Sequence, residues 1–402
     1  MNWKKPFFTI YAGQGFSLLS SAAVQFSIIW WITLTTGSPL AITLAAVAGL
    51  LPQAVIGPFA GVWIDRLNRK GIMIVADGVV ASGSAVLFIA FLFGTPPMWM
   101  IYAVLFIRAL GETFHKPALN TIIPQLVPKE ELTKAGGLGQ LISSACNILG
   151  PMLGGLLMSI TTLGVAMLVD MFGAMLAIIT ITAVRIPRQS SFQVEKIKIW
   201  SDMKKGLVAM KQNKALMRVF IPFFLTTIIF VPIGTMLPLM VKNYFGGNAW
   251  QNSLVQTLFS VGMLLAAGII GVTGGMKKQF LMIALSISVL GVGSVLGGFV
   301  PANLFWMFCI CVFVIGACGM CFNIPFTSYL QRTISEENLG KVMSLVTSIL
   351  SFAAPVGMFI SGPIAQIVGV SNWMRGAGAV MIIVGIITYL FTREFDGKEK
   401  VN

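Results

Sequence analysis

The chain has 402 residues, of which 56% are hydrophobic and only 10% are charged, and its formal net charge is +14 at pH 7. No water-soluble domain could cover its surface with so few polar side chains, so the composition predicts a membrane protein. Apolar and polar residues do not alternate with a period of two, which excludes a transmembrane β-barrel and leaves membrane-spanning helices.

Twelve apolar runs follow one another along the chain. Each has about 20 residues or more, the length that a helix needs to cross a hydrocarbon core of about 30 Å. We therefore predict an all-α membrane protein with twelve transmembrane helices, at residues 8–34, 40–63, 71–94, 98–121, 134–159, 161–185, 215–241, 250–274, 279–300, 303–326, 341–367 and 373–392. An even number of spans places both termini on the same side of the membrane.

Lysine and arginine indicate which side that is. Of the 27 present, only Arg108, Lys242 and Arg375 lie away from the N-terminus, the even-numbered loops and the C-terminus. By the positive-inside rule, both termini of this multi-pass protein are predicted to be cytoplasmic, in the cell membrane. Topology and anionic lipid then account for the net charge, and we expect no nucleic-acid partner.

The first span carries two polar side chains, Gln14 and Gln25, that could face a cavity. Asn147 in the fifth span and Asn323 in the tenth are similar candidates for lining a substrate cavity. Each is more often a hydrogen bond between helices than a ligand contact.

The loop after the second span, within GVWIDRLNRKGIMI, holds Asp65, Arg66, Arg69 and Lys70. A carboxylate at the end of a span can bind the positive N-terminus of the next helix, or an arginine, in one conformation and release it in another. Asp65 would then be a conformational latch, and Asp77, a turn or two into the third span, a further member of its network. A solvated loop that only orients the protein is the alternative.

The fourth span contains two ionisable residues at membrane depth, where each costs roughly 2.5 to 3.5 kcal/mol on insertion scales. Arg108 lies near the midplane, and Glu112 follows one turn later on the same face. We expect the two to pair, with Glu112 as the leading candidate for the proton carrier and a structural ion pair as the alternative. His115, the only histidine, is expected to be a surface residue near the inner end of this span.

The fifth span contains Gly150, Pro151, Gly154 and Gly155. Two glycines one turn apart let another helix approach closely, and the proline bends the span. In the sixth span, Asp170 has no cation nearby in sequence and is the rival proton carrier. A polar group that ties two helices together is the alternative for it.

A basic segment at residues 186–214 divides the spans six and six. Within it, four apolar residues are spaced about four apart with lysines between them, which predicts an amphipathic helix on the inner membrane surface. They are Ile199, Met203, Leu207 and Met210. An ordinary connector with a helical turn or two is the alternative.

The C-terminal spans contain no acidic residue, and they hold four of the five cysteines. Cys318 and Cys321 have a redox or zinc spacing, yet no second pair and no histidine lies near them in sequence, so we interpret them as packing residues. We expect no metal and no cofactor.

An internal repeat supports two halves, 1–185 and 215–402. A proline precedes an acidic pair, a leucine and a lysine in each, from Pro117 to Lys134 and again from Pro325 to Lys341. The offsets are 208 for the prolines and 207 for the lysines. We infer that both halves descend from one six-helix unit.

The sequence resembles the major facilitator superfamily on three motifs in the expected order. Gly61, Asp65, Arg66, Arg69 and Lys70 match the superfamily's G-x-x-x-D-R-x-x-R-K loop. The stretch 106–111, FIRALG, is similar to the arginine motif of the fourth span, and 150–155, GPMLGG, to the antiporter motif of the fifth. The stretches FFTIYAGQGFSLL and FIRALGETFHKPALN resemble the macrolide-efflux branch of the drug:proton antiporters.

This resemblance implies two pseudo-symmetric six-helix bundles, a division that transporters built from repeats share. It also implies a proton-coupled exporter of bulky amphipathic compounds, macrolide-like or multiple drugs, that works by alternating access. Its partners would be a small-molecule substrate and protons, it would function as a monomer, and it would not be an enzyme. Packing at the glycine motif would then seal the interface between the halves.

Three alternatives remain open at this point. The chain could export an endogenous product such as a siderophore, or it could be a facilitative uptake porter. A membrane enzyme or a scaffold belongs to a different class. No G-x-x-x-x-G-K-[ST] sequence for a built-in ATPase occurs. In the C-terminal copy of the loop motif, Gly275 stands where the acid would be.

Overall fold

The computed structural model describes residues 3–184 and 199–396, apart from the side chains of a few helical residues. In the first part, six long helices follow one another. They are α1 (Lys4–Thr36), α2 (Pro39–Arg66), α3 (Arg69–Leu92), α4 (Met98–Leu126), α5 (Leu132–Ile160) and α6 (Leu163–Ala183). A single 3-10 turn, Lys129–Glu131, leads into α5.

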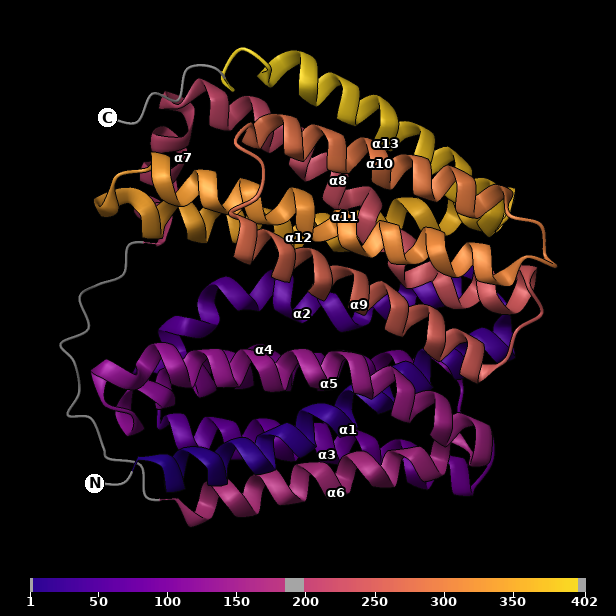
Figure 1. The fold of residues 1–402 in the computed structure, drawn as a ribbon. Coiled ribbons are helices and arrows are strands. Elements are labelled where there is room, and N and C mark those ends of the chain that lie inside the picture. Colours follow the sequence, from indigo (N-terminus) through magenta and orange to yellow (C-terminus); the bar gives the residue numbers. More distant parts are fainter. Residues whose placement is uncertain (1–2, 185–198, 397–402) are drawn as a thin grey trace. The chain divides into compact units, whose positions relative to one another are not determined.

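The second part contains seven more helices (Figure 1). They are α7 (Ile199–Gln212), α8 (Lys214–Leu239, continued by a π turn at Met240–Tyr244), α9 (Ala249–Thr273), α10 (Gln279–Phe299), α11 (Phe305–Thr333), α12 (Glu336–Val368) and α13 (Val370–Thr392). Each predicted span corresponds to one helix, so the prediction of twelve membrane-spanning helices is confirmed.

Eleven helices of the described residues are long and apolar enough to cross a membrane by length and composition alone. Among the helices at the twelve predicted spans, the exception is α4, which has 29 residues but carries Arg108, Glu112, His115 and Lys116.

The chain forms two units, one of Met1–Thr35 with Ala45–Ile197 and the other of Thr36–Leu44 with Lys198–Asn402. In the first, α3 packs against both α4 and α6. In the second, α10 packs against α11 and α13, and α12 packs against α8. The domain boundaries that the sequence suggests, at 185 and 215, stay a prediction.

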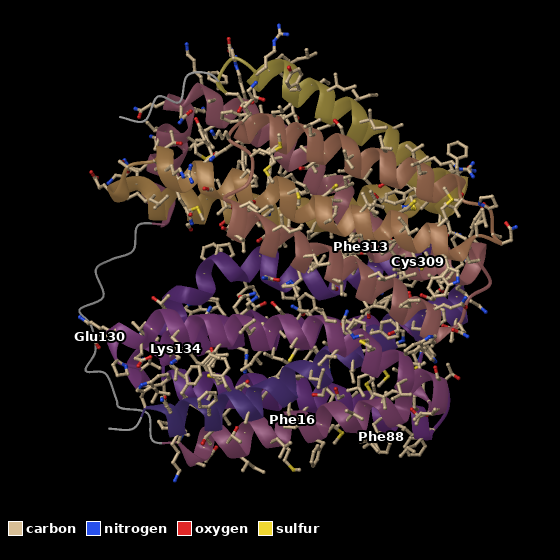
Figure 2. All side chains as sticks on the ribbon, in the orientation of Figure 1. Phe16, Phe88, Glu130, Lys134, Cys309 and Phe313 are labelled. Atoms are coloured by element: carbon tan, nitrogen blue, oxygen red, sulfur yellow. The ribbon has the colours of Figure 1, made fainter. Side chains whose placement is uncertain are left out.

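The core of the first unit draws on five helices. Ile10 of α1, Ile64 of α2, Met73 of α3, Ala118 of α4 and Ile181 of α6 are all buried together. Figure 2 shows Glu130 and Lys134, where α4 gives way to α5, at one end of this unit and Phe88 towards the other end.

The predicted linker helix exists as α7, and it packs against α12. Gly206 makes this approach possible, since a Cβ atom there would lie 2.9 Å from the carbonyl oxygen of Lys341. Met210 is buried, whereas Leu207 and Val208 are exposed. Leu207 and Met210 therefore do not share one free face, and the side chain of Ile199 lies outside the described residues. The position of α7 on the membrane surface stays a prediction.

Candidate functional site

A buried ion pair joins α4 to α6. Arg108 Nη1 binds Asp170 Oδ2, and the two side chains are only 3% and 1% exposed. Ser84 of α3 donates to Asp170 Oδ2 over 2.6 Å and accepts from Arg108 Nη1 over 2.6 Å. Ser21 of α1 donates to the other carboxylate oxygen over 2.8 Å. Four helices thus supply one polar cluster, which we call the Asp170 cluster.

Small residues let these helices meet. Gly83 of α3 lies against the side chain of Arg108, where a Cβ atom would lie 3.3 Å from its Cγ. Gly111 of α4 faces the backbone of Ala76 in α3, so that its Cβ atom would lie 3.0 Å from that carbonyl oxygen. Small residues at helix contacts are the usual means of close packing in membranes.

The prediction that Arg108 pairs with Glu112 is wrong, because Arg108 pairs with Asp170. The i,i+4 rule considers one helix alone. Here Arg108 lies on a face of α4 that packs against α3 and reaches Asp170 of α6, while Glu112 lies about 40° further round the helix. Glu112 is exposed, and among the described residues it makes no hydrogen bond or ion pair. Which acid carries a proton stays a proposal.

A second buried cluster surrounds Asp77 of α3, which is 4% exposed. Gln14 Nε2 of α1 donates to Asp77 Oδ2 over 3.2 Å, and Ser17 Oγ of α1 lies 3.5 Å from Oδ1. His115 Nε2 of α4 lies 3.4 Å from Asp77 Oδ1. We call these four residues the Asp77 cluster; its membership of the latch network stays a prediction.

The prediction that His115 is a surface residue is wrong, since its side chain is only 13% exposed. The neighbouring Lys116 is exposed, but adjacent residues on a helix point about 100° apart, so one says little about the other. The environment of His115 depends on α1 and α3, which the sequence of α4 does not reveal.

The loop motif is engaged within the first unit. Lys70 Nζ donates to the carbonyl oxygens of Thr182 and Val184 over 2.9 and 2.8 Å, at the end of α6. Arg69 donates to the carbonyl oxygen of Thr121 in α4 over 3.4 Å. Lys70 therefore lies where a cation stabilises the negative C-terminal end of α6, and Arg69 ties the loop to α4. The side chains of Asp65 and Arg66, and the position of Gly61, lie outside the described residues.

The glycines of the fifth span pack on α1 of the same unit. A Cβ atom at Gly154 would lie 2.5 Å from the carbonyl oxygen of Ala23, and one at Gly150 would collide with Ala22. Gly155 is buried as well, and Pro151 lies inside the helix. The expectation of a close helix approach at Gly150 and Gly154 is confirmed, and its role between the halves stays a prediction.

Of the four polar cavity candidates, Gln14 is buried in the Asp77 cluster. Gln25 and Asn147 are exposed. Asn323 is exposed and lines a cavity in the second unit. The sequence alone therefore does not distinguish a polar residue that joins two helices from one that lines a cavity, because glutamine and asparagine can do both.

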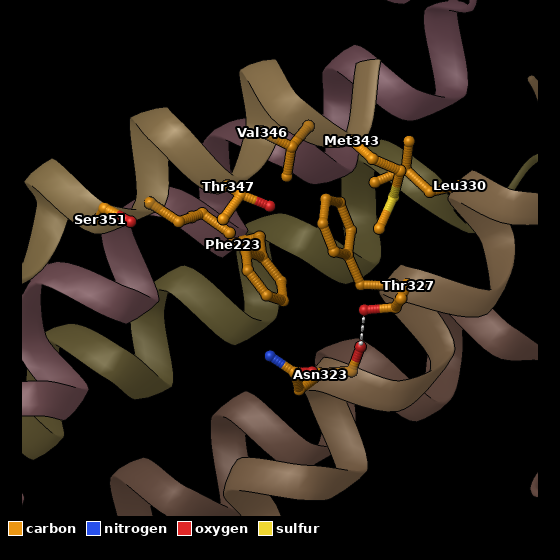
Figure 3. A pocket seen from close by; sticks show the side chains of 10 residues that line it. Phe223, Asn323, Thr327, Leu330, Met343, Val346, Thr347 and Ser351 are labelled. Atoms are coloured by element: carbon orange, nitrogen blue, oxygen red, sulfur yellow. Dashed lines mark hydrogen bonds between the residues drawn. The ribbon is translucent and has the colours of Figure 1, made fainter. Parts of the chain in front are cut away.

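The cavity in the second unit has a volume of about 340 Å³ (Figure 3). Phe223 of α8 and Phe326 of α11 stack beside it, with ring centroids 4.0 Å apart. Asn323, Thr327, Thr347 and Ser351 supply its polar groups, and the remaining lining residues are Leu330, Met343, Val346 and Leu350. None of the lining residues, all of them described, is charged. Such a surface suits a neutral, mainly apolar group with a few hydrogen-bonding atoms.

The five cysteines are free, and four are buried. Among the described residues, no group of three or more histidine, cysteine, aspartate or glutamate side chains could hold a metal ion.

Comparison with known proteins identifies relatives of this chain. The sequence profile of the Major Facilitator Superfamily matches residues 10–279 and 233–402. Macrolide efflux protein A of Streptococcus pyogenes is 37% identical over 393 residues, 96% of each chain. Macrolide efflux protein A of Enterococcus faecalis is 36% identical, over 80% of this chain and all of its own.

The fold also has solved counterparts. A bacterial homologue of the human lysosomal transporter Spinster, in an inward-facing and unoccupied conformation, superimposes with a TM-score of 0.74 over 98% of this chain and 97% of its own. Its sequence is only 14% identical, so this likeness concerns the fold alone.

Proposed function

Since the chain belongs to the major facilitator superfamily, in the branch that holds the macrolide efflux proteins, we propose that it exports bulky amphipathic compounds in exchange for protons. The chain is a multi-pass membrane transporter and not an enzyme. The proposed substrates are macrolides or multiple drugs. Alternating access, function as a monomer and cytoplasmic termini are parts of the same proposal.

The observation that carries this proposal is the unequal distribution of acidic residues between the two units. The acids at membrane depth, Asp77, Glu112 and Asp170, all belong to the first unit. Between residues 215 and 392, the only acids are Glu336 and Glu337, in the first turn of α12. The cavity beside Phe223 and Phe326 is neutral. Proton chemistry in one unit and apolar binding surface in the other suit an exporter of uncharged or weakly charged drugs.

The proposed carrier mechanism exchanges the partner of Arg108. Its Nε and Nη2 atoms are buried and make no hydrogen bond, so the guanidinium has donors to spare. A proton on Asp170 removes the charge that holds Nη1. Arg108 then turns its free donors to Glu112, one turn along α4, because an unpaired guanidinium is costly in the membrane. Loss of the proton restores the pair with Asp170.

The driving force is sufficient for this exchange. One proton that enters down a potential of 100 mV supplies about 2.3 kcal/mol, enough for roughly a fifty-fold gradient of a neutral substrate. If a monocation leaves as one proton enters, no net charge moves, and only the pH difference contributes, about 1.4 kcal/mol per unit.

The proposal is tested with cells that do or do not express the chain and with radiolabelled erythromycin, a macrolide, with and without an uncoupler. Expressing cells should accumulate less label, and the uncoupler should remove the difference. Equal accumulation in both cell lines would exclude erythromycin export and favour an endogenous product. Export that resists the uncoupler would contradict proton coupling.

Two variants address the carrier mechanism. Glu112→Gln should abolish uphill export and its pH dependence, because Arg108 loses its second partner, yet downhill exchange should remain. Asp170→Asn should do the same, because it imitates the protonated acid. Undiminished, uncoupler-sensitive export by Glu112→Gln would remove that residue from the mechanism. Undiminished export by Asp170→Asn would instead show that Asp170 does not carry the proton and would leave Glu112 as the candidate carrier.

A further inference from the structure

The Asp77 cluster is one positive charge short. Asp77 is buried and accepts contacts from Gln14 and Ser17, both of which are neutral. The remaining neighbour is His115, whose Nε2 lies 3.4 Å from the carboxylate and is buried without a hydrogen bond. Gln14 Oε1 is also buried and makes no hydrogen bond. A proton on Nε2 would turn this contact into a charged pair, so the cluster is built to hold one.

Other charged groups near His115 do not replace that proton. On its own helix, Glu112 and Lys116 flank it with opposite charges, and both are exposed. On α6 the nearest acid, Asp170, is already paired with Arg108. The contacts from α1 are neutral, and Trp63 of α2 stacks on Phe114, the residue before His115. Within the described residues, Asp77 is thus the acid in contact with His115.

The two clusters are aligned along the bundle. Asp77 and Ser84 on α3 are seven residues apart, as are His115 and Arg108 on α4. Seven residues are two helical turns, or about 10 Å. Helix α1 touches both clusters, because Ser17 lies against Asp77 and Ser21 donates to Asp170, one turn further on. The Asp77 cluster lies nearer the end of the bundle where α1 begins.

We propose that Asp77 and His115 form a second proton-binding site, which exchanges the transported proton between Asp170 and the side of the membrane where α1 begins. This inference rests on the proposed proton coupling. A proton leaving the Asp170 carboxyl group passes to the Ser21 hydroxyl and, across one water, to the Ser17 hydroxyl. Ser17 passes a proton to Asp77 Oδ1, and Asp77 hands it to His115 Nε2, 3.4 Å away. Each hydroxyl gives up one proton as it accepts another, and His115 finally releases one to water.

The experiment uses the fact that His115 is the only histidine. Protein labelled with ¹³C and ¹⁵N in histidine alone, purified through a tag without histidine and placed in lipid nanodiscs, gives a single set of imidazole signals. If His115 binds and releases a proton beside Asp77, the signals should move between neutral and charged forms when the pH is varied from 5 to 9. Signals that stay in one form over this range would overturn the proposal.

Variants separate the site from its surroundings. In Asp77→Asn, the ratio of charged to neutral imidazole at pH 6 should fall roughly ten-fold, because the partner charge is lost. Gln14→Glu adds a carboxylate and should increase that ratio, which keeps the test decisive if Asp77→Asn does not insert. Ser82→Ala, at an exposed serine of α3 that lies outside both clusters, is the matched control. A ratio that responds equally little to all three would contradict the proposal.

Transport distinguishes failure of this site from failure of the proposed function. In proteoliposomes that contain the purified chain, His115→Gln should retain erythromycin binding but lose at least ten-fold in pH-driven export. Lys116→Gln, at the exposed neighbouring position, should keep it. If the parent protein ignores the pH gradient, proton coupling is wrong even where His115 titrates. If the parent responds and His115→Gln exports normally, the second site is wrong.

Discussion

At the scale of single residues, the Asp170 cluster shows how a membrane protein keeps a charge without water. Asp170 has three partners, Arg108, Ser84 and Ser21, from three neighbouring helices. Removing one partner leaves an oxygen of the buried carboxylate without a hydrogen bond. The cost of that unsatisfied group is larger than the net contribution of the hydrogen bond itself. The two serines therefore tune the carboxylate that the proposed exchange depends on.

Replacement of Ser84 by alanine tests this tuning. Hydrogen bonds in membrane proteins contribute about 0.6 kcal/mol on average and at most about 1.7, so Ser84→Ala should insert and fold. It should shift the pH dependence of erythromycin export, because Ser84 touches both Asp170 and Arg108. Ser82→Ala is the control, since Ser82 is exposed on the same helix and donates only to the carbonyl of Val79. Identical pH profiles for the two variants would argue against a role for Ser84.

The residues of both clusters could be predicted from the sequence better than their partners. Arg108, Asp77 and Asp170 stand out as charges in apolar runs. The partner of Arg108 does not, because it comes from a helix 62 residues further on. The sequence does contain one signal for the partners, because polar residues recur at intervals of seven on three helices. The pairs are Gln14 with Ser21, Asp77 with Ser84, and Arg108 with His115. This spacing predicts two polar layers in one bundle.

At the scale of helices, the close contact between α1 and α5 tests whether the glycines at 150–155 are needed for packing. A methyl group at Gly154 would meet the backbone oxygen of Ala23, and backbone cannot move aside as a side chain can. Along the same helix, Gly137 is exposed, and a Cβ atom there would meet nothing within 4 Å. One helix therefore supplies both a crowded and an open glycine.

Gly154→Ala should lower the stability of the purified protein by about 1 to 3 kcal/mol, the usual cost of overpacking a close contact. Gly137→Ala should be neutral or stabilise by up to about 1 kcal/mol, because alanine is the better helix former. Thermal unfolding in detergent, followed by tryptophan fluorescence, measures both. Gly94, which follows the end of α3, would be a poor control for this experiment, since its φ of 134° would strain any side chain. Equal melting temperatures for the two variants would mean that α5 tolerates separation from α1.

The positions of the helices followed from apolar run lengths, and their ends needed the three-dimensional structure. The sequence predicts a span at 98–121, whereas α4 continues to Leu126. The additional turn packs Ile122 into the core of the first unit. The amphipathic pattern predicted α7, but only the fold shows that Met210 packs against protein. A hydrophobic stripe does not distinguish a membrane surface from a neighbouring helix.

At the scale of the whole molecule, the first unit has the charges and the second has the neutral cavity. The C-terminal copy of the loop motif lacks its acid, since Gly275 takes that place with a φ of 74°. In the first unit, Arg69 binds the carbonyl oxygen of Thr121 in α4, and Lys70 binds that of Thr182 near the end of α6. These two cations thus anchor the loop, and the remaining residues of the motif, Asp65 above all, are the candidates for a latch that opens and closes.

The last prediction concerns that latch. If Asp65 stabilises one conformer and releases it in the other, its charge changes the balance between conformers and not the affinity of either for substrate. Asp65→Asn should therefore cut erythromycin export at least ten-fold, which corresponds to about 1.4 kcal/mol in the conformational equilibrium, while the protein still inserts and still binds erythromycin. Glu130→Gln, an exposed acid in the turn before α5, is the matched control and should export normally. Transport assays in proteoliposomes, together with a binding assay in detergent, separate the two quantities.

Normal export by Asp65→Asn would show that the loop serves only to orient the chain. Loss of binding together with export would place the defect in folding and not in a latch.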